Sequence, residues 1–151
     1  MVLADNKRAV MSYELLEKFE AGLVLLGHEV KSIKAGSASL KESYVTFIGE
    51  ELFLVKCHVS LYKGAAGLKD SYNTLRNRKL LLKKRELMSI KGKVSQQGLT
   101  LVPLKIYTNK SLLKLEFAIG RGLKKYDKRE LIKKRETDRY LKVLTKKKAR
   151  G

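Results

Sequence analysis

Residues 99–120 carry the pattern that most restricts how this chain can fold. Two apolar runs flank a polar turn, and in the second run apolar side chains at 113–119 alternate with lysine, glutamate and alanine. Successive side chains of a strand point to opposite faces, so this alternation predicts a strand with one buried face. The turn at Asn109-Lys110 predicts a hairpin. Pro103 cannot donate a ladder hydrogen bond, so its strand should lie at an edge or contain a bulge there.

Similar signals predict the other strands. The segment "SYVTFIGEELFLVKCHV" (43–59) has two β-branched or aromatic runs around Gly49-Glu50, which predicts a second hairpin. "KLLLK" (79–83) is short and apolar, as expected of a buried strand. Residues 13–27 fit either a helix or a strand, although the glycine in "AGLVLL" disfavours a long helix.

Two short helices are expected, at 28–36 and 84–98. Each segment has apolar residues three or four positions apart and ends at a glycine. Residues 60–78 contain glycines and no sustained period, which predicts a long mobile loop.

About six strands and two small helices, without βαβ alternation, predict a mainly β fold: a small closed antiparallel barrel. Residues 1–122 are assigned to the barrel and 123–151 to a basic C-terminal tail. The two glycines of "GRG" (120–122) are interpreted as the seam, because glycine removes the backbone restriction on both sides of Arg121.

Charge indicates the class of partner. The chain has 34 Lys and Arg against 15 Asp and Glu, a net +19, and such an excess attracts polyanions. Nucleic acid is the first candidate and an anionic membrane surface the second. Charge interrupts every apolar run before the roughly 20 residues that span a bilayer, and the start lacks an apolar signal-peptide core. We therefore expect no membrane insertion and a cytoplasmic protein, which the single cysteine also fits.

No pattern for catalysis is recognised, so no enzyme activity, cofactor or metal is expected. One cysteine and two isolated histidines cannot supply a metal site. His28 and His58 are interpreted as structural or solvated, and Cys57 as a buried inert thiol. The remaining signal is basic residues with tyrosines among them, because Lys and Arg neutralise phosphates and tyrosine stacks on unpaired bases. The tyrosines in basic segments, each of which either stacks on RNA or covers a barrel end, are Tyr62, Tyr72, Tyr126 and Tyr140.

Five stretches match one family in the same order. They are "NKRA" (6–9), "FEAGLVLLGHEVKSIKAG" (19–36), "SYV" (43–45), "RKLLLKKREL" (78–87) and "YDKRELIKKRE" (126–136). Over nearly its full length the chain thus resembles the SmpB family, the SsrA-binding proteins of bacterial trans-translation. The resemblance implies an OB-like barrel that binds the tRNA-like part of transfer-messenger RNA (tmRNA) and delivers it to stalled ribosomes. A monomer is expected.

The resemblance also implies that the tail enters the empty mRNA channel beyond the decoding centre. Residues 121–151 hold 14 basic and 4 acidic residues, a net +10. Asp127 followed by Glu130 fits a capping box, but "KKRETDR" (133–139) has no apolar face. The tail is therefore expected to be disordered when free and helical when surrounded by ribosomal RNA phosphate.

Site residues are carried over by their position in the motifs. Glu20, Leu81 and Lys114 align with positions tied to tmRNA binding. Lys114 can meet phosphate directly, whereas Glu20 can accept hydrogen bonds from base edges or a 2′-hydroxyl, or orient a basic neighbour. Leu81 is interpreted as packing behind the RNA face, with direct contact to the RNA as the alternative. Basic residues inside matched motifs add Lys7, Lys31 and Arg78, and the seam and tail add Gly122, Tyr126, Asp127, Lys128 and Arg129.

The chain departs from the family pattern in three places. Tyr72-Asn73-Thr74 stand where His-Asp-Pro is common, and His28 stands where tryptophan is frequent. Tyr126 replaces a frequent histidine before "DKR"; a phenol still stacks on a base but does not titrate near neutrality.

Two other functions stay open on sequence alone. An RNA-processing enzyme on a similar barrel would need a metal or acid–base cluster. A basic ribosome-associated structural protein would co-purify with mature ribosomes in the absence of tmRNA.

Overall fold

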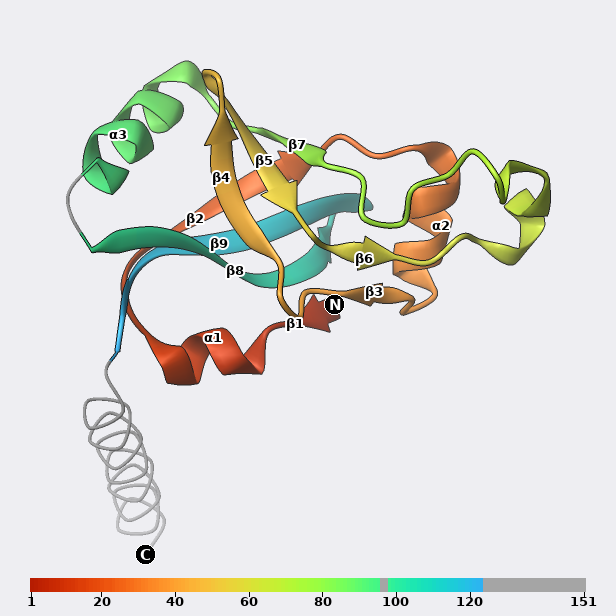
Figure 1. Cartoon of the computed structure of the whole chain (residues 1–151), viewed down its shortest axis with the longest axis horizontal. Helices are drawn as coiled ribbons and strands as arrows, with labels where there is room; N and C mark the ends of the chain where they lie inside the picture. Colours follow the sequence, from red (N-terminus) through yellow and green to blue (C-terminus); the bar gives the residue numbers. More distant parts are fainter. Residues whose placement is uncertain (96–97, 124–151) are drawn as a thin grey trace, which may run out of the picture.

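The computed structural model describes residues 1–95 and 98–123, and Figure 1 shows curved strands with helices at their margins. The strands are β1 (Val2–Asp5), β2 (Tyr13–Leu23), β3 (Ala38–Ser39), β4 (Tyr44–Ile48), β5 (Glu51–Val55), β6 (His58–Val59), β7 (Arg78–Leu81), β8 (Leu99–Asn109) and β9 (Leu112–Gly122). The helices are α1 (Lys7–Ser12), α2 (Gly27–Lys34), α3 (Lys84–Val94) and the 3₁₀ helix η1 (Lys63–Leu68).

Six strands close into a barrel in the order β8-β4-β5-β7-β2-β9, because β9 pairs back onto β8. Every pairing in the part of the chain described is antiparallel. Closure protects strand edges, which would otherwise expose unpaired backbone groups. The predicted mainly β closed barrel is confirmed, whereas the two conformations predicted for the tail concern residues 124–151, which lie outside the described residues.

The hairpin predicted at 99–120 is β8–β9. Its turn is Lys110-Ser111, one residue later than expected, and both residues have positive φ, 50° and 69°. Such turns match the twist of paired strands. The register shifts between Pro103 and Lys105, so the bulge predicted at the proline is confirmed. The Pro103 carbonyl accepts a hydrogen bond from the side-chain amide of Asn6, at 3.0 Å.

The second predicted hairpin and both predicted helices are present. β4 and β5 meet at a turn where Gly49 has a φ of 66°. α2 and α3 are followed by Gly36 and Gly98, each with a φ of 84°, the left-handed conformation common at helix C-termini. Residues 13–27, which the sequence left ambiguous, form β2 as far as Leu23.

The barrel interior is a continuous apolar core. Leu115 and Phe117 of β9 are fully buried, and Ile33 of α2 and Ile90 of α3 belong to the same cluster. The ring of Phe117 stacks on that of Phe19 across the β2–β9 pair, with centroids 5.6 Å apart. The alternation seen in the sequence therefore points the apolar side chains of β9 inward and leaves its polar side chains on the outside of the barrel.

A short helix, α1, is present that the sequence did not predict. Its buried residue, Ala9, packs with Val102, Leu104 and Ala118 on the outside of β8 and β9. Six residues with one buried side chain contain no apolar period to detect. This second small core covers part of the barrel's outer surface and brings the basic "NKRA" segment next to it.

The glycines at 120 and 122, interpreted from the sequence as the seam, stand at the end of β9, which ends at Gly122. Both lie in β9, paired with β2, and neither has a positive φ. A Cβ at Gly120 would lie 3.3 Å from side-chain atoms of Tyr13 and Val102. Close packing, rather than backbone freedom, accounts for glycine at position 120.

The segment at 60–78 contains more structure than a loop. It includes η1, and its last residue, Arg78, begins β7. The strand predicted at 79–83 is only half buried, because Leu80 is 2% exposed but Leu81 is 53% exposed.

No helix within residues 1–95 and 98–123 is long and apolar enough to cross a membrane.

Candidate nucleic-acid interface

One outer surface of the barrel brings together the three residues to which the resemblance gives tmRNA contacts. The outer face, as we call it, consists of two rows of paired residues: Leu81, Gly22, Lys114 and Tyr107 in one row, and Glu20, Glu116 and Lys105 in the other. The rows run across β7, β2, β9 and β8, which are neighbours in the barrel. All seven residues are exposed or half-exposed. Strand pairing thus places Glu20, Leu81 and Lys114 side by side, although they are far apart in sequence.

The charges of the outer face are partly paired with one another. Glu116 forms ion pairs with Lys105, at 3.5 Å, and with Lys18, at 3.8 Å. The hydroxyl of Tyr107 donates a hydrogen bond to the Glu20 carboxylate. Burial, followed by this contact with Glu20, raises the pKa of Tyr107 above its usual range, so the phenol remains a hydrogen-bond donor at neutral pH.

Lys7 adjoins the outer face through a cleft. The cleft has a volume of about 500 Å³ and lies beside α1, where Lys7, Lys18 and Lys105 line it together with Glu116. Three lysines around one cleft can neutralise neighbouring phosphates. The "NKRA" motif therefore reaches the same surface as Glu20 and Lys114, because α1 packs on the outside of β8 and β9.

Leu81 does not pack behind the RNA face, as the sequence had suggested. Its side chain is 53% exposed and lies over Gly22, where a Cβ would be 3.4 Å from the Leu81 Cβ. The interpretation of Leu81 as a packing residue is therefore wrong. An exposed leucine between Gly22 and the solvent offers an apolar contact to a sugar or a base.

Lys31 lies away from the outer face. It is exposed on α2, and its ammonium group lies 5.7 Å from the centre of the Tyr62 ring. Tyr62 precedes η1 and is itself 36% exposed. A lysine over an accessible aromatic ring forms a cation–π pair that can meet phosphate and base together. Lys31 is therefore paired with Tyr62 and is not one of the residues of the outer face.

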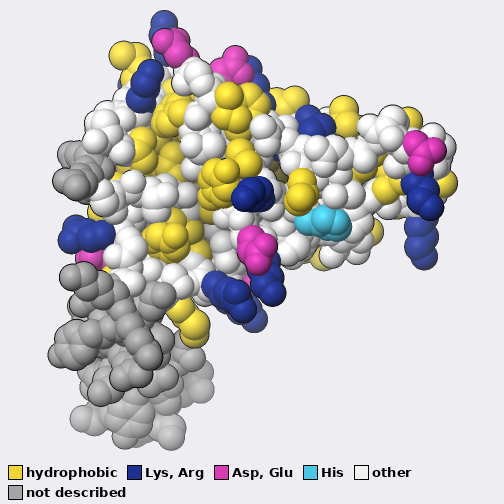
Figure 2. Space-filling model, in the orientation of Figure 1, with side chains coloured by type: hydrophobic (Ala, Val, Ile, Leu, Met, Phe, Trp, Pro, Cys, Tyr) yellow, Lys and Arg dark blue, Asp and Glu magenta, His cyan; other side chains and the backbone are white. Residues whose placement is uncertain are grey.

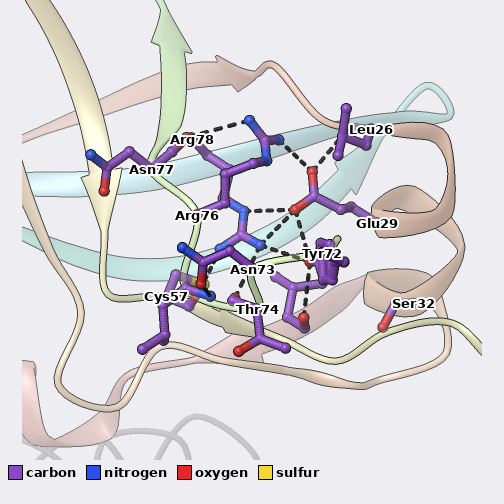
Figure 3. A network of polar contacts seen from close by, with 12 residues as sticks. Leu26, Glu29, Ser32, Cys57, Tyr72, Asn73, Thr74, Arg76, Asn77 and Arg78 are labelled. Carbon is purple, nitrogen blue, oxygen red and sulfur yellow. Dashed lines mark hydrogen bonds and ion pairs between the residues drawn. The ribbon is translucent and has the colours of Figure 1, made fainter. Parts of the chain in front are cut away.

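Arg78 is buried, which corrects its assignment as a residue that contacts RNA directly. Its side chain is 1% exposed, and Figure 3 shows its guanidinium facing Glu29 of α2. Nε donates to the Glu29 carboxylate at 2.9 Å, and the other nitrogens donate to the carbonyls of Cys57 and Thr74. Arg76 pairs with the same carboxylate. Arg78 thus fixes the segment at 60–77 to α2 and has no group left for a phosphate.

Glu29 is the centre of this buried network. Burial alone would raise its pKa, but hydrogen bonds from Arg76, from the Leu26 N–H and from Arg78 lower it to about 2. The carboxylate is therefore charged at neutral pH although Glu29 is 0% exposed. Glu29 and Arg78 both lie inside the motifs matched to the family, which is the one signal in the sequence for this network, but no pattern indicates that the two side chains meet.

Two of the departures from the family pattern contact each other. The His28 ring meets the Tyr72 ring edge-on, with centroids 4.5 Å apart. The Tyr72 hydroxyl lies 3.0 Å from the Glu29 carboxylate and 3.0 Å from the Val59 carbonyl. Burial, then Glu29, raises the pKa of Tyr72 to about 12. Tyr72 is therefore part of this network, and its hydroxyl is engaged by protein groups.

The remaining predicted site residues lie at the C-terminal end. Gly122 pairs with Tyr13 as the last residue of β9. The tail residues predicted to act on the ribosome, and a further tyrosine, lie outside the described residues: Tyr126, Asp127, Lys128, Arg129 and Tyr140.

Another cleft, between α3 and the β4–β5 hairpin, has an apolar lining together with two lysines and Glu50. Its volume is about 630 Å³, and Phe47, Leu87 and Met88 line it, with Lys84 and Lys91 at the edge. Figure 2 shows hydrophobic side chains gathered between α3 and the β4–β5 hairpin, with both basic and acidic side chains at the margin. None of the residues carried over from the family lies in this cleft.

Metal binding and cysteine chemistry concern the titratable residues within the described ranges. No group of three or more His, Cys, Asp or Glu side chains there could hold a metal ion. Cys57 is buried, and this burial raises the pKa of its thiol to about 11. The thiolate form is therefore rare at neutral pH, as expected for an inert cysteine.

The lysines, the Glu20 carboxylate and the exposed Leu81 of the outer face are groups of the kinds that contact phosphate, base edges and ribose in RNA. A family model described as "SmpB protein" matches residues 3–147. The SsrA-binding protein of Syntrophobacter fumaroxidans is 45% identical over 145 residues, covering 96% of this chain and 89% of the relative. That of Neorickettsia sennetsu is 50% identical over 136 residues, covering 89% and 91%. A solved structure described as "tmRNA-SmpB: a journey to the center of the bacterial ribosome" aligns with a TM-score of 0.63 and 42% identity, over 85% of this chain and 92% of that one. With its barrel and nearly all of its length matched in this way, the chain belongs to the SmpB family.

Proposed function

We propose that this chain is an RNA-binding adaptor of trans-translation. It binds the tRNA-like part of tmRNA and delivers it to stalled ribosomes. Its relatives are named SsrA-binding proteins, and the solved structure with the same fold is described as tmRNA–SmpB in the bacterial ribosome. Its partners are therefore tmRNA and the ribosome, and we propose that it acts as a monomer in the cytoplasm.

The observation that carries this proposal is the convergence of Glu20, Leu81 and Lys114 on the outer face. The three come from β2, β7 and β9, and the pairing of Gly22 with both Leu81 and Lys114 brings them together. Lys114 forms no ion pair within residues 1–95 and 98–123. Its ammonium group is therefore free to bind a phosphate without first breaking an internal contact.

The basic residues beside α1 extend the proposed contact. Lys7, Lys18 and Lys105 line one cleft at the margin of the outer face. Phosphates position an RNA, whereas base edges and 2′-hydroxyls distinguish it. We assign the lysines to phosphate contacts and Glu20 to recognition of base edges or 2′-hydroxyls. Lys31 with Tyr62 forms a separate site that can hold a second stretch of RNA or a ribosomal surface.

We propose that the tail, residues 123–151, occupies the empty mRNA channel beyond the decoding centre. Its support is the net charge of +10 in residues 121–151 and the match of "YDKRELIKKRE" to the family. The role is that of an adaptor and not an enzyme. The alternatives are an RNA-processing enzyme or a structural protein of the ribosome, and RNA cleavage or tmRNA-independent ribosome binding would favour them.

The test is capture of RNA by the tagged protein, followed by sequencing, and then equilibrium binding to the tmRNA recovered. We expect tmRNA to dominate the captured RNA. Replacing Lys114 with Ala should weaken binding and reduce the slope of log K against log salt by about 0.7–0.9, the value for one phosphate contact. Lys91→Ala removes an exposed lysine on α3, away from the outer face, and should leave the slope unchanged. Equal effects of the two variants would mean that the outer face is not the binding surface.

A further inference from the structure

The outer face contains an unexpected pair of acids. Glu20 of β2 and Glu116 of β9 are directly opposite each other in a chain with a net charge of +19. Like charges directly opposite in a sheet destabilise it. Lys18 and Lys105 neutralise Glu116. Glu20 has no basic partner within residues 1–95 and 98–123, and its carboxylate is bound only by the Tyr107 hydroxyl.

Tyr107 reaches Glu20 across an intervening strand. It lies on β8 opposite Lys114 of β9, whereas Glu20 lies on β2, on the other side of β9. The ring therefore extends over β9 between the two rows of the outer face. The Lys105 ammonium lies 5.5 Å from the centre of this ring, which favours the ring's position through a cation–π contact. Tyr107 donates to Oε2 of Glu20 and leaves Oε1 without a partner among the described residues.

We propose that Tyr107 is a positioning residue for RNA recognition, resting on the proposed function above. Its hydroxyl fixes the Glu20 carboxylate so that the second oxygen, Oε1, accepts a hydrogen bond from the RNA. A carboxylate repels phosphate, so its ligand must be a hydrogen-bond donor: a ribose 2′-hydroxyl or a base N–H. Lys114, diagonal to Glu20 in the sheet, holds the neighbouring phosphate.

The physical reason for such a residue is the cost of ordering a long side chain. A free glutamate on a strand surface samples several rotamers, and binding must select one of them. A hydrogen bond from a ring that is itself contacted by the Lys105 ammonium removes part of this cost before RNA arrives. The tyrosine thus contributes to affinity without touching the RNA.

The test is a double-mutant cycle on binding of the full chain to a transcript of the tmRNA tRNA-like domain. Tyr107→Phe removes only the hydroxyl and keeps the ring. We expect it to weaken binding about three- to tenfold, the range for one hydrogen bond. Glu20→Ala should weaken binding by at least as much, and adding Tyr107→Phe to Glu20→Ala should change nothing further.

Controls separate positioning from phosphate binding and from folding. Tyr107→Phe should keep the salt slope of the native chain, because it removes no phosphate contact. Its thermal unfolding should also be unchanged, since the hydroxyl is on the outside of the barrel. Tyr44→Phe is the matched control variant. Tyr44 is an exposed tyrosine on β4, and the Lys56 ammonium lies 5.9 Å from the centre of its ring. The variant should bind as the native chain does.

The outcomes distinguish the inference from the proposed function. If Tyr107→Phe weakens binding equally in the native chain and in the Glu20→Ala variant, the hydroxyl contacts RNA itself and the positioning role is wrong. If Tyr107→Phe has no effect while Glu20→Ala and Lys114→Ala weaken binding, only the inference fails. If none of the three weakens binding, the outer face is not the interface, and both fail.

Transcripts with single atoms replaced identify the donor. Positions are substituted one at a time, either with 2′-deoxynucleotides or with base analogues that lack an amino group. A substitution that weakens binding of the native chain but not of Glu20→Ala marks the group that Glu20 binds. The same substitution should lose its effect with Tyr107→Phe. If every substitution acts equally on the native chain and on Glu20→Ala, the carboxylate binds no donor and the inference is overturned.

Discussion

Replacing Glu29 with glutamine is predicted to destabilise the barrel strongly, although the two side chains have nearly the same shape. Glutamine keeps an acceptor oxygen but removes the negative charge. The Arg78 guanidinium, which is 1% exposed, would then remain buried as an uncompensated cation beside Arg76. Removing one partner of a buried ion pair typically costs about 3–5 kcal/mol.

The pKa of Glu29 gives an independent magnitude. It is lowered from 4.5 to about 2 in the folded protein, and a shift of this size corresponds to about 3 kcal/mol. Because the folded-state pKa is the lower one, this stabilisation is fully present above pH 4.5. It is lost as the pH falls from 4.5 towards 2. The free energy of unfolding of Glu29→Gln should lack this part of the acid dependence.

Thermal and urea unfolding of the full chain, followed by circular dichroism, measure the effect. For a chain of this length, about 3 kcal/mol lowers the melting temperature by about 10 °C. Glu50→Gln, at an exposed turn, is the matched control and should shift it by less than about 2 °C. Adding Arg78→Met to Glu29→Gln should recover part of the stability, because the unpaired cation is gone. A melting temperature of Glu29→Gln at neutral pH within about 2 °C of the native value would refute the reasoning.

Three further predictions concern other parts of the chain. Gly120→Ala should lower the free energy of unfolding by about 1–3 kcal/mol, because the new Cβ would lie 3.3 Å from Tyr13 and Val102; urea unfolding measures this, and an unchanged midpoint would contradict it. His28→Trp and Tyr72→His, which restore the frequent family residues at two contacting positions, should be non-additive in thermal unfolding, by about 1 kcal/mol in favour of the double variant. Additive effects would mean that the two departures are independent. Shuffling residues 128–139 at constant composition should abolish peptide tagging on stalled ribosomes but preserve tmRNA binding, whereas tagging at the native rate would show that bulk charge suffices.

Much of the fold could be predicted because its signals are local. The alternation at 113–119, the polar turns and the glycines after the helices each report a backbone requirement within a few residues. Closure of the barrel and the bulge at Pro103 followed from these. α1 was missed because its contact with Ala118 and Val102 is made by a single alanine, Ala9, which creates no pattern.

The site could be predicted only in part, because exposure and partners depend on distant pairing. Leu81 looks like a core residue in "KLLLK", yet its paired residue on β2 is Gly22, and the Leu81 side chain stays exposed. Arg78 looks like a phosphate ligand in the sequence, yet its guanidinium donates to the buried Glu29 carboxylate of α2. The contact between Tyr107 and Glu20 could not be predicted from the sequence, because it crosses an intervening strand and no local spacing indicates it.

The central claim is that the outer face binds the tRNA-like part of tmRNA, and photo-crosslinking tests it most directly. A diazirine amino acid is placed at position 81, on the outer face, or at position 88, on α3 beside the β4–β5 hairpin. Leu81 and Met88 are 53% and 66% exposed, so both positions are accessible. With purified tmRNA and the full chain, position 81 should crosslink to the tRNA-like part and position 88 should not. Crosslinking from position 88 alone, or equally from both positions, would contradict the account.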